Sequence, residues 1–120
     1  MRWLVDGMNL IGSRPTGWWR DRPGAMRELV EELEAFAAAT DEPVTVVFDG
    51  RPFELASESV EVVFASRRGR DAADDDIARL AHEGVRVVTS DRALADRVRA
   101  AGGEVEGVSS FRSRLKDGVQ

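Results

Sequence analysis

Residues 44 to 50 read Val-Thr-Val-Val-Phe-Asp-Gly, a short and nearly continuous apolar run, rich in β-branched side chains, that ends at an Asp-Gly pair. A strand with one face in solvent alternates apolar and polar residues, whereas a strand covered on both faces is apolar almost throughout. Residues 44–48 follow the second pattern. They therefore predict a buried strand of a parallel sheet.

The segments on either side of this strand alternate between the strand and helix patterns. Between Pro23 and Ala37 the apolar residues recur at the i, i+3, i+4 and i+7 spacing of a helix, while the segment from Gly7 to Trp19 is expected to be a long loop. Strands are predicted at 3–5, 44–48, 60–64, 85–89 and 104–106, and helices from Pro23, between Asp71 and Gly84, at 92–101 and at 111–116. This order indicates an α/β fold whose central sheet is mainly parallel, with about five strands.

The composition is typical of one compact domain. A chain of 120 residues with 42% hydrophobic content can bury a single core, so residues 1–120 are expected to form one domain. The absence of cysteine excludes disulfides, zinc-thiolate sites and thiol nucleophiles, and it suits a reducing compartment, so we expect a cytoplasmic protein. The sequence contains neither a signal peptide pattern nor an apolar run of the roughly 20 residues that span a bilayer, which predicts no membrane association.

The net charge of −5 at first argues against a nucleic-acid partner, because phosphate binding depends on basic residues. The arginines are nevertheless clustered, at positions 14, 20 and 22, at 67, 68 and 70, and at 112 and 114. Rich use of Arg, Ala, Gly and Val has a second explanation in the nucleotide composition of the genome. The charge distribution alone therefore leaves a nucleic-acid partner open.

Acidic residues follow the predicted strands at the edge where open α/β sheets bind ligands. Asp6 follows the first strand, Asp49 the second, and Asp91 the fourth, and the segment 71–76 adds four aspartates at a helix start. Each has an ordinary explanation as a turn residue or a helix cap. Together they repel, since two unit charges roughly 5 Å apart cost on the order of 3 kcal/mol at an effective dielectric of about 20. A cation that offsets this repulsion is therefore expected.

Magnesium fits such a set best, because it prefers oxygen ligands and is held by a few carboxylates together with substrate phosphate. The sequence lacks the Gly-x-Ser-x-Gly, Walker and Gly-x-Gly-x-x-Gly motifs, which disfavours a serine hydrolase, a nucleotide kinase and a dehydrogenase. The lone histidine, His82, lies late in a predicted helix and is expected to be structural.

Four short motifs, in this order and spacing, resemble those of NYN domains of the YacP-like group. They are Val-Asp-Gly-Met-Asn-Leu-Ile at 5–11, Val-Phe-Asp-Gly at 47–50, Ala-Asp-Asp-Asp-Ile at 73–77 and Val-Thr-Ser-Asp-Arg at 88–92, and the likeness extends to Gly-Val-Ser-Ser-Phe at 107–111. The resemblance implies a PIN-like, three-layer α/β/α sandwich. It also implies an endoribonuclease that depends on Mg²⁺ or Mn²⁺.

The resemblance also assigns roles to individual residues. Asp6, Asp74 and Asp91 match metal-binding aspartates, and Asn9 matches the asparagine beside the first of them. Asp74 is preferred to Asp75 as the ligand because it shares a helical face with Ile77, whereas Asp75 is placed towards the rim. The predicted catalytic set is Asp6, Asn9, Asp74, Asp75, Thr89 and Asp91, and the predicted metal ligands are Asp6, Asp74 and Asp91.

The remaining acids receive lesser roles. Asp76 is expected in solvent and Asp71 at the helix N-cap. Asp49 is expected to be peripheral, because in a PIN-like sheet its strand flanks the first strand on the side away from the fourth. The acid that some relatives carry four residues after Asp91 is absent here, and the substitution of Asp96 for it is left open.

Substrate contacts are predicted from basic and aromatic residues. Arg67, Arg68 and Arg70 directly precede the acidic helix start and are expected to contact phosphates. Trp18 and Trp19 lie near Arg14 and can stack on unpaired bases, with core packing or a partner interface as the alternative for at least one of them. The rival to an enzyme is a catalytically silent module of the same fold that binds RNA or the ribosome. The sequence leaves the oligomeric state open, a homodimer included.

Overall fold

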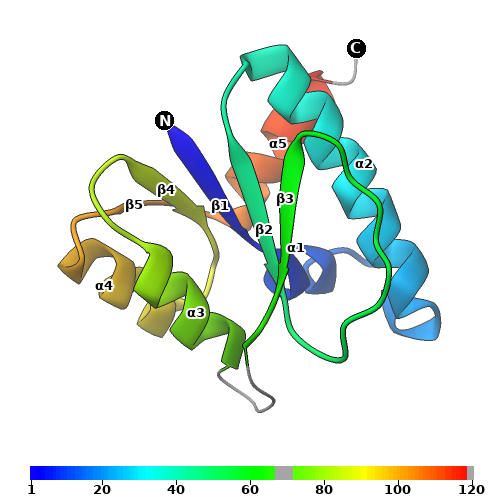
Figure 1. Cartoon of the computed structure of the whole chain (residues 1–120), viewed down its shortest axis with the longest axis horizontal. Helices are drawn as coiled ribbons and strands as arrows, with labels where there is room; N and C mark the ends of the chain where they lie inside the picture. Colours follow the sequence, from blue (N-terminus) through cyan, green and yellow to red (C-terminus); the bar gives the residue numbers. More distant parts are fainter. Residues whose placement is uncertain (67–71, 119–120) are drawn as a thin grey trace.

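The computed structural model, which describes residues 1–66 and 72–118, has a five-stranded sheet with the strand order β3-β2-β1-β4-β5, in which all neighbouring strands are parallel. Helices cover both faces of this sheet (Figure 1). The strands are β1 (Arg2–Asp6), β2 (Val44–Phe48), β3 (Val60–Phe64), β4 (Val85–Val88) and β5 (Glu104–Glu106), and the helices are α1 (Gly7–Gly12), η1 (Trp18–Arg20), α2 (Arg22–Thr40), α3 (Ala72–Leu80), α4 (Arg92–Ala100) and α5 (Val108–Gly118). The predicted α/β sandwich with a parallel sheet is confirmed.

The core consists of two apolar layers, one on each face of the sheet. Alternate residues of β1 point to opposite faces, so Trp3 and Val5 pack with α1, α2 and α5, whereas Leu4 packs with α3 and α4. The aromatic rings of Trp3, Phe36 and Phe111 meet in the first layer, with centroids between 5.1 and 5.3 Å apart. A strand between these two layers has side chains buried on both faces of the sheet. This explains the continuous apolar pattern of residues 44–48.

The segment between β1 and α2 differs from the prediction. A long loop was expected after Asp6, but the chain enters α1 at once and forms η1 before α2. Leu10 and Ile11 are the buried hydrophobic side chains of α1, at 0% and 1% exposure. A helix of six residues is too short to display a helical period, so the apolar pair is the only local signal of this element.

Helix α5 also begins earlier than predicted, at Val108 instead of Phe111. Val108 is buried, and its backbone N–H donates to Ser90 Oγ over 3.1 Å. This bond attaches the first turn of α5 to the segment that follows β4. The contact joins residues far apart in sequence, which is why the local pattern did not show it.

The start of β3 is held by a side chain of α2. The carboxylate of Glu34 accepts hydrogen bonds from the backbone N–H groups of Glu58, Ser59 and Val60 and from the Ser59 hydroxyl. Burial alone would raise the pKa of Glu34, but these donors outweigh it and lower the pKa below its ordinary value. Glu34 thus ties the β2–β3 connection to α2.

None of the helices in the described part of the chain is both long enough and apolar enough to cross a membrane. This agrees with the amphipathic pattern of α2, whose buried residues lie along one side.

Candidate functional site

The strand order brings the first and fourth strands together at the centre of the sheet. Because β1 and β4 are parallel and pair Val5 with Val88, the residues that follow each strand lie side by side at the carboxyl edge. Asp6 ends β1, and Thr89 follows β4. The Thr89 hydroxyl donates to Asp6 Oδ2 over 3.0 Å and accepts from the backbone N–H of Asp91 over 3.1 Å. One buried hydroxyl therefore connects the two aspartates.

Asp6 is a buried acid in an unfavourable environment. It is 6% exposed, and its pKa is raised from the ordinary 3.8 to about 6, mainly by burial. The negative charges of Asp74 and Asp91 contribute to this rise, whereas the Thr89 hydroxyl and the Asn9 backbone amide oppose it. The influence of Asp74 and Asp91 on Asp6 indicates that β1, α3 and the segment after β4 direct carboxylates to the same part of the edge.

Asn9 and Ser90 join α1 to this edge. The Asn9 side-chain Oδ1 accepts from the backbone N–H of Ser90 over 2.9 Å, and Ser90 Oγ in turn accepts from Val108 N–H. The segment that carries Asp91 is therefore held from α1 on one side and from α5 on the other. The sequence did not single out Ser90, since nothing in its local pattern distinguishes it from an ordinary loop serine.

Asp91 also has the structural role that its position allows. Its Oδ1 accepts from the backbone N–H of Leu94 over 3.0 Å and so caps the N-terminus of α4. Its side chain is half-buried. One carboxylate oxygen of Asp91 is thus occupied by the cap, which fixes this side chain at the N-terminus of α4.

Helix α3 presents its acids differently from the prediction. Asp74 and Asp75 lie in its first turn and are half-buried, and Asp75 forms an ion pair with Arg97 of α4 at 2.9 Å. Asp76 was expected in solvent, and that expectation is wrong. Asp76 is 4% exposed and accepts from the backbone N–H and the hydroxyl of Ser66. Asp76 is buried because the side of α3 that carries it packs against the segment that follows β3.

Asp76 also contacts the Arg79 guanidinium, one turn further along α3. A buried carboxylate with these partners has a structural function, which is to hold α3 against the sheet. Because α3 carries Asp74, the position of Asp76 helps to place Asp74 at the edge. The i, i+3 spacing of Asp76 and Arg79 was the one local signal of this pair.

Two further acids lie outside the group around Asp6. Asp49 is partly exposed at the end of β2 and forms an ion pair with Arg22 at 3.0 Å. Its strand flanks β1 on the side away from β4, as predicted. Asp96 has an 83% exposed side chain and lies 3.9 Å from Arg99 of the same helix. It lines an open pocket of about 620 Å³ together with Thr89, Ser90 and Asp91.

The acidic edge does not form a closed metal cage. Among residues 1–66 and 72–118, no three or more His, Cys, Asp or Glu side chains are grouped so that they could hold a metal ion together. The donor type nevertheless fits a hard divalent cation, because Asp6, Asp74 and Asp91 are all carboxylates and their mutual repulsion raises the pKa of Asp6. Asp6, Asp74 and Asp91 are thus close enough to influence one another's charge but do not form a closed set of metal ligands.

The predicted substrate-contacting residues have different surroundings. Arg67, Arg68 and Arg70, with Asp71, lie outside the described residues. Arg14 forms a two-bond ion pair with Glu32.

Trp18 and Trp19 meet edge to face, with ring centroids 6.0 Å apart. Trp18 is half-buried and packs against the apolar layer formed with α2 and α5, whereas Trp19 is 59% exposed. The Arg20 guanidinium lies 5.9 Å from the Trp19 ring centroid. Trp19 is therefore the tryptophan with a face available for stacking, and Trp18 supports it.

The family of the chain is shown by its sequence as a whole. Residues 3–119 match the family described as the YacP-like NYN domain. The chain belongs to this family. The resemblance inferred from the four motifs is thereby confirmed, and with it a PIN-like, nuclease-type fold. No curated protein sequence matches the chain.

Two crystal structures of Rae1 (YacP) from Bacillus subtilis share the fold of this NYN domain. The structure of a tryptophan-to-leucine mutant has a TM-score of 0.81 at 23% identity, and the alignment covers 98% of this chain and 76% of that one. The second Rae1 structure has a TM-score of 0.80 at 22% identity and covers 98% and 75%. At this identity the likeness extends to the fold, and the chemistry is argued from the residues of this chain.

Proposed function

We propose that this NYN domain is a Mg²⁺- or Mn²⁺-dependent endoribonuclease that hydrolyses RNA phosphodiester bonds at the carboxyl edge of the sheet. The observation that carries the proposal is the buried Asp6, whose pKa is raised to about 6 with Asp74 and Asp91 contributing. A neutral side chain at this buried position would make the folded protein more stable than the acid does. A buried acid with a raised pKa is therefore typical of a functional site. Membership of the NYN family supports a nuclease, since NYN nucleases generally depend on divalent metals.

Asp6, Asp74 and Asp91 are the residues that would hold the cation. A bound Mg²⁺ or Mn²⁺ orients a phosphodiester, lowers the pKa of water and stabilises negative charge on the leaving 3′ oxygen. These three carboxylates would supply oxygen ligands, and a bound cation would offset the repulsion among them. RNA phosphate would complete the coordination that the three carboxylates leave open.

The neighbouring residues position these acids. The Thr89 hydroxyl orients the Asp6 carboxylate by donating to Oδ2, and Asn9 holds the segment of Asp91 through Ser90. The ion pair between Asp75 and Arg97 fixes α3 against α4. We assign Thr89 and Asn9 to the catalytic set on this basis and Asp75 to its support.

RNA contacts belong to the same proposal. Trp19 offers an exposed ring on which a base can stack, an interaction worth roughly 1 to 3 kcal/mol per base. Arg14, Arg67, Arg68 and Arg70 are proposed to contact backbone phosphates, which position a strand without reading its sequence. A ribosomal partner and a cytoplasmic location remain predictions from the sequence.

The decisive experiment is RNA cleavage by purified protein in Mn²⁺, in Mg²⁺ and in EDTA. Single-stranded and structured RNAs labelled at one end are incubated with wild type and with the variants Asp6→Asn, Asp74→Asn and Asp49→Asn. The last is a matched control, because it removes a carboxylate from the same sheet edge but outside the group around Asp6. We expect metal-dependent cleavage by wild type and Asp49→Asn, and a loss of at least about 100-fold in the other two.

The competing result is equally definite. If wild type binds the RNAs but cleaves none of them with either metal, and Asp6→Asn binds equally well, the nuclease proposal is wrong. That outcome would favour the catalytically silent RNA-binding module. Cleavage that survives both Asp6→Asn and Asp74→Asn would retain the enzyme but move its site elsewhere.

A further inference from the structure

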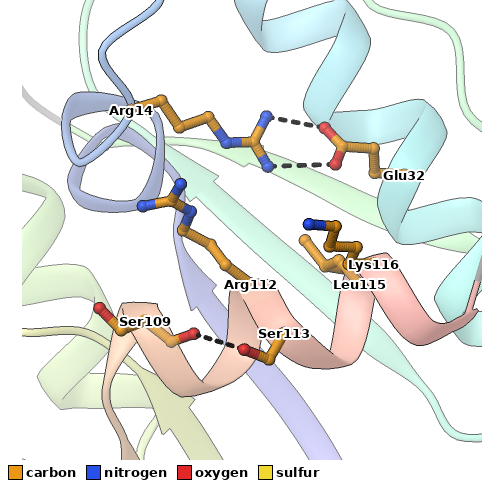
Figure 2. Close-up of a pocket in the computed structure, with 7 residues that line it drawn as sticks. All are labelled: Arg14, Glu32, Ser109, Arg112, Ser113, Leu115 and Lys116. Carbon is orange, nitrogen blue, oxygen red and sulfur yellow. Dashed lines mark hydrogen bonds and ion pairs between the residues drawn. The ribbon is translucent and has the colours of Figure 1, made fainter.

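A second pocket lies between the end of α1, helix α2 and helix α5, and none of Asp6, Asp74 and Asp91 lines it. Its volume is about 590 Å³, and Figure 2 shows Arg112 and Lys116 extending from α5 on the side that faces Arg14 and Glu32. The lining is Arg14, Glu32, Ser109, Arg112, Ser113, Leu115 and Lys116. Three of these side chains are basic and one is acidic, so the pocket is positive in a protein whose net charge is −5.

The positive charge is not neutralised within the pocket. Arg14 and Glu32 satisfy each other through two hydrogen bonds of 2.8 and 3.1 Å. Arg112 and Lys116 form no ion pair with any residue that the structure describes. The only hydrogen bond of the Arg112 guanidinium there is a long one of 3.3 Å to the Ser13 carbonyl oxygen. Both cations are thus available to an anion from solvent.

The neutral donors of the pocket suit a phosphate. Ser109 and Ser113 are exposed on successive turns of α5, and the Ser113 hydroxyl donates over 3.4 Å to the Ser109 backbone carbonyl, a long bond that a better acceptor can replace. Hydroxyl groups beside arginine and lysine are common partners of phosphate oxygens. Leu115 is the one apolar residue of the lining and is buried in the core, and the other six residues carry polar or charged groups.

Helix α1 connects this pocket to the acidic edge. It begins directly after Asp6, and the carbonyl that Arg112 contacts belongs to Ser13, the C-cap of α1. A helix of six residues is about 9 Å long. The two ends of α1 thus place Asp6 and the Arg112 contact about one short helix apart, a separation that a bound polynucleotide strand can span.

We infer that the pocket of Arg112 and Lys116 binds a backbone phosphate of the RNA strand whose scissile bond lies at the acidic edge. The inference rests on the proposed function for the identity of the strand, but its test does not require cleavage. An acidic peptide would satisfy the same cations. RNA is favoured because α1 runs from the proposed nuclease site at Asp6 to the Ser13 carbonyl that Arg112 contacts.

The test measures binding of fluorescently labelled single-stranded RNA to the full chain in EDTA over a series of salt concentrations. The variants are Arg112→Gln, Lys116→Gln and Arg112→Lys, with Arg2→Gln as the matched control. Arg2 is exposed at the start of β1, at the opposite end of the strand from Asp6. Circular dichroism and thermal melting of each variant verify that it is folded.

Loss of one phosphate contact lowers the salt slope of log K by about 0.7, which is about fivefold in affinity at 0.1 M salt. We expect this change in Arg112→Gln and in Lys116→Gln, recovery in Arg112→Lys, and wild-type behaviour in Arg2→Gln. Binding by Arg112→Gln and Lys116→Gln that equals that of Arg2→Gln would overturn the inference, and so would a wild type that binds no RNA. Equal binding of a polyglutamate peptide, with the same dependence on Arg112, would replace RNA by an acidic protein partner.

The same data separate this inference from the proposed function. If Arg112→Gln weakens RNA binding although wild type cleaves nothing with either metal, the pocket is supported and the nuclease is not. If wild type cleaves RNA but the pocket variants bind normally, the nuclease is supported and the pocket is not.

Discussion

At the scale of single residues, Asp6 combines burial with repulsion from neighbouring acids. Its pKa of about 6 means that the folded chain resists ionisation of this carboxyl more than the unfolded chain does. The Thr89 hydroxyl reduces this cost without removing it. Asp6 therefore links the stability of the protein to pH and to cations.

The first prediction concerns the pH dependence of stability in EDTA. Below pH 3.8 both states hold the proton, and between 3.8 and about 6 the folded state holds more protons than the unfolded state, so stability falls as pH rises. Above pH 6 the ionised Asp6 carboxylate lowers the free energy of unfolding by its full amount, on the order of 3 kcal/mol. We expect Asp6→Asn to be more stable than wild type by up to this amount at pH 7.5, with the difference vanishing near pH 4.

Urea unfolding of both proteins across this pH range measures the difference, and the comparison removes the titration of all other groups. The Asn side chain retains an oxygen that accepts from Thr89. If the free energies of unfolding of wild type and Asp6→Asn changed with pH in the same way, Asp6 would have its ordinary pKa and the prediction would be wrong.

The second prediction concerns Thr89, which is 1% exposed. Thr89→Val removes both hydrogen bonds of the hydroxyl and leaves the Asp6 carboxylate with less support, so we expect a loss of about 1 to 3 kcal/mol of stability. The pKa of Asp6 should rise, because the Thr89 bond lowers it. Thr89→Ser keeps the hydroxyl and should cost about 1 kcal/mol or less, for the lost methyl group. NMR titration of the Asp6 carboxyl distinguishes the two variants, and an unchanged pKa in Thr89→Val would contradict the assignment.

At the scale of elements, the junction of β1 and α1 requires a glycine. Asp-Gly at 6–7 has the sequence of a turn, but Gly7 is the first residue of α1 and is packed against the end of β2. A Cβ at this position would lie 2.5 Å from Phe48 Cε1 and 3.0 Å from the Val47 carbonyl oxygen. The glycine is therefore explained by close approach and not by a turn conformation.

The third prediction follows from this contact. Gly7→Ala must displace Phe48, which is fully buried, and we expect a loss of about 1 to 3 kcal/mol of stability. Gly12→Ala, at the other end of the same helix, is the control, because the nearest atom to its Cβ is Trp18 Cζ2 at 3.9 Å. That variant should be neutral or more stable by up to about 1 kcal/mol. Denaturant unfolding of both proteins tests the pair, and equal stabilities would contradict the packing argument.

At the scale of the whole molecule, the sheet order places negative charge at the carboxyl edge, while α5 carries positive charge to a pocket beyond the end of α1. The net charge of −5 conceals this separation. Local charge, rather than the sum, decides where a cation and a phosphate can bind.

The fourth prediction is that Mg²⁺ or Mn²⁺ stabilises the folded protein. A cation that binds only the folded state adds about 1.4 kcal/mol at ten times its Kd, which corresponds to about 5 °C in Tm for a domain of this size. We expect this rise in wild type and in Asp49→Asn at constant ionic strength, and no rise in Asp6→Asn. An equal increase in Asp6→Asn would assign the cation to another site.

Much of the fold was predictable because it depends on local apolar patterns. Residues 44–48 and 60–64 show the apolar, β-branched composition of strands, and the strands of the structure have these bounds. The expected burial on both faces is confirmed for β2 but not for β3, which is an edge strand with Glu61 exposed and residues 62–64 half-buried. Helix α1 was missed because six residues are too few for a period. Asp76 was assigned to solvent because helical spacing alone does not state which face packs against the sheet.

The sequence by itself determined the family, the parallel sheet and the set of acids at its carboxyl edge, since these follow from patterns of adjacent residues. The tertiary structure alone decided which acids interact. It joined Asp6 to Thr89 across 83 residues, buried Asp76 against Ser66, and brought Arg112 to the end of α1. These contacts depend on strand order and helix packing, which place residues distant in sequence within hydrogen-bonding distance and which no local pattern encodes.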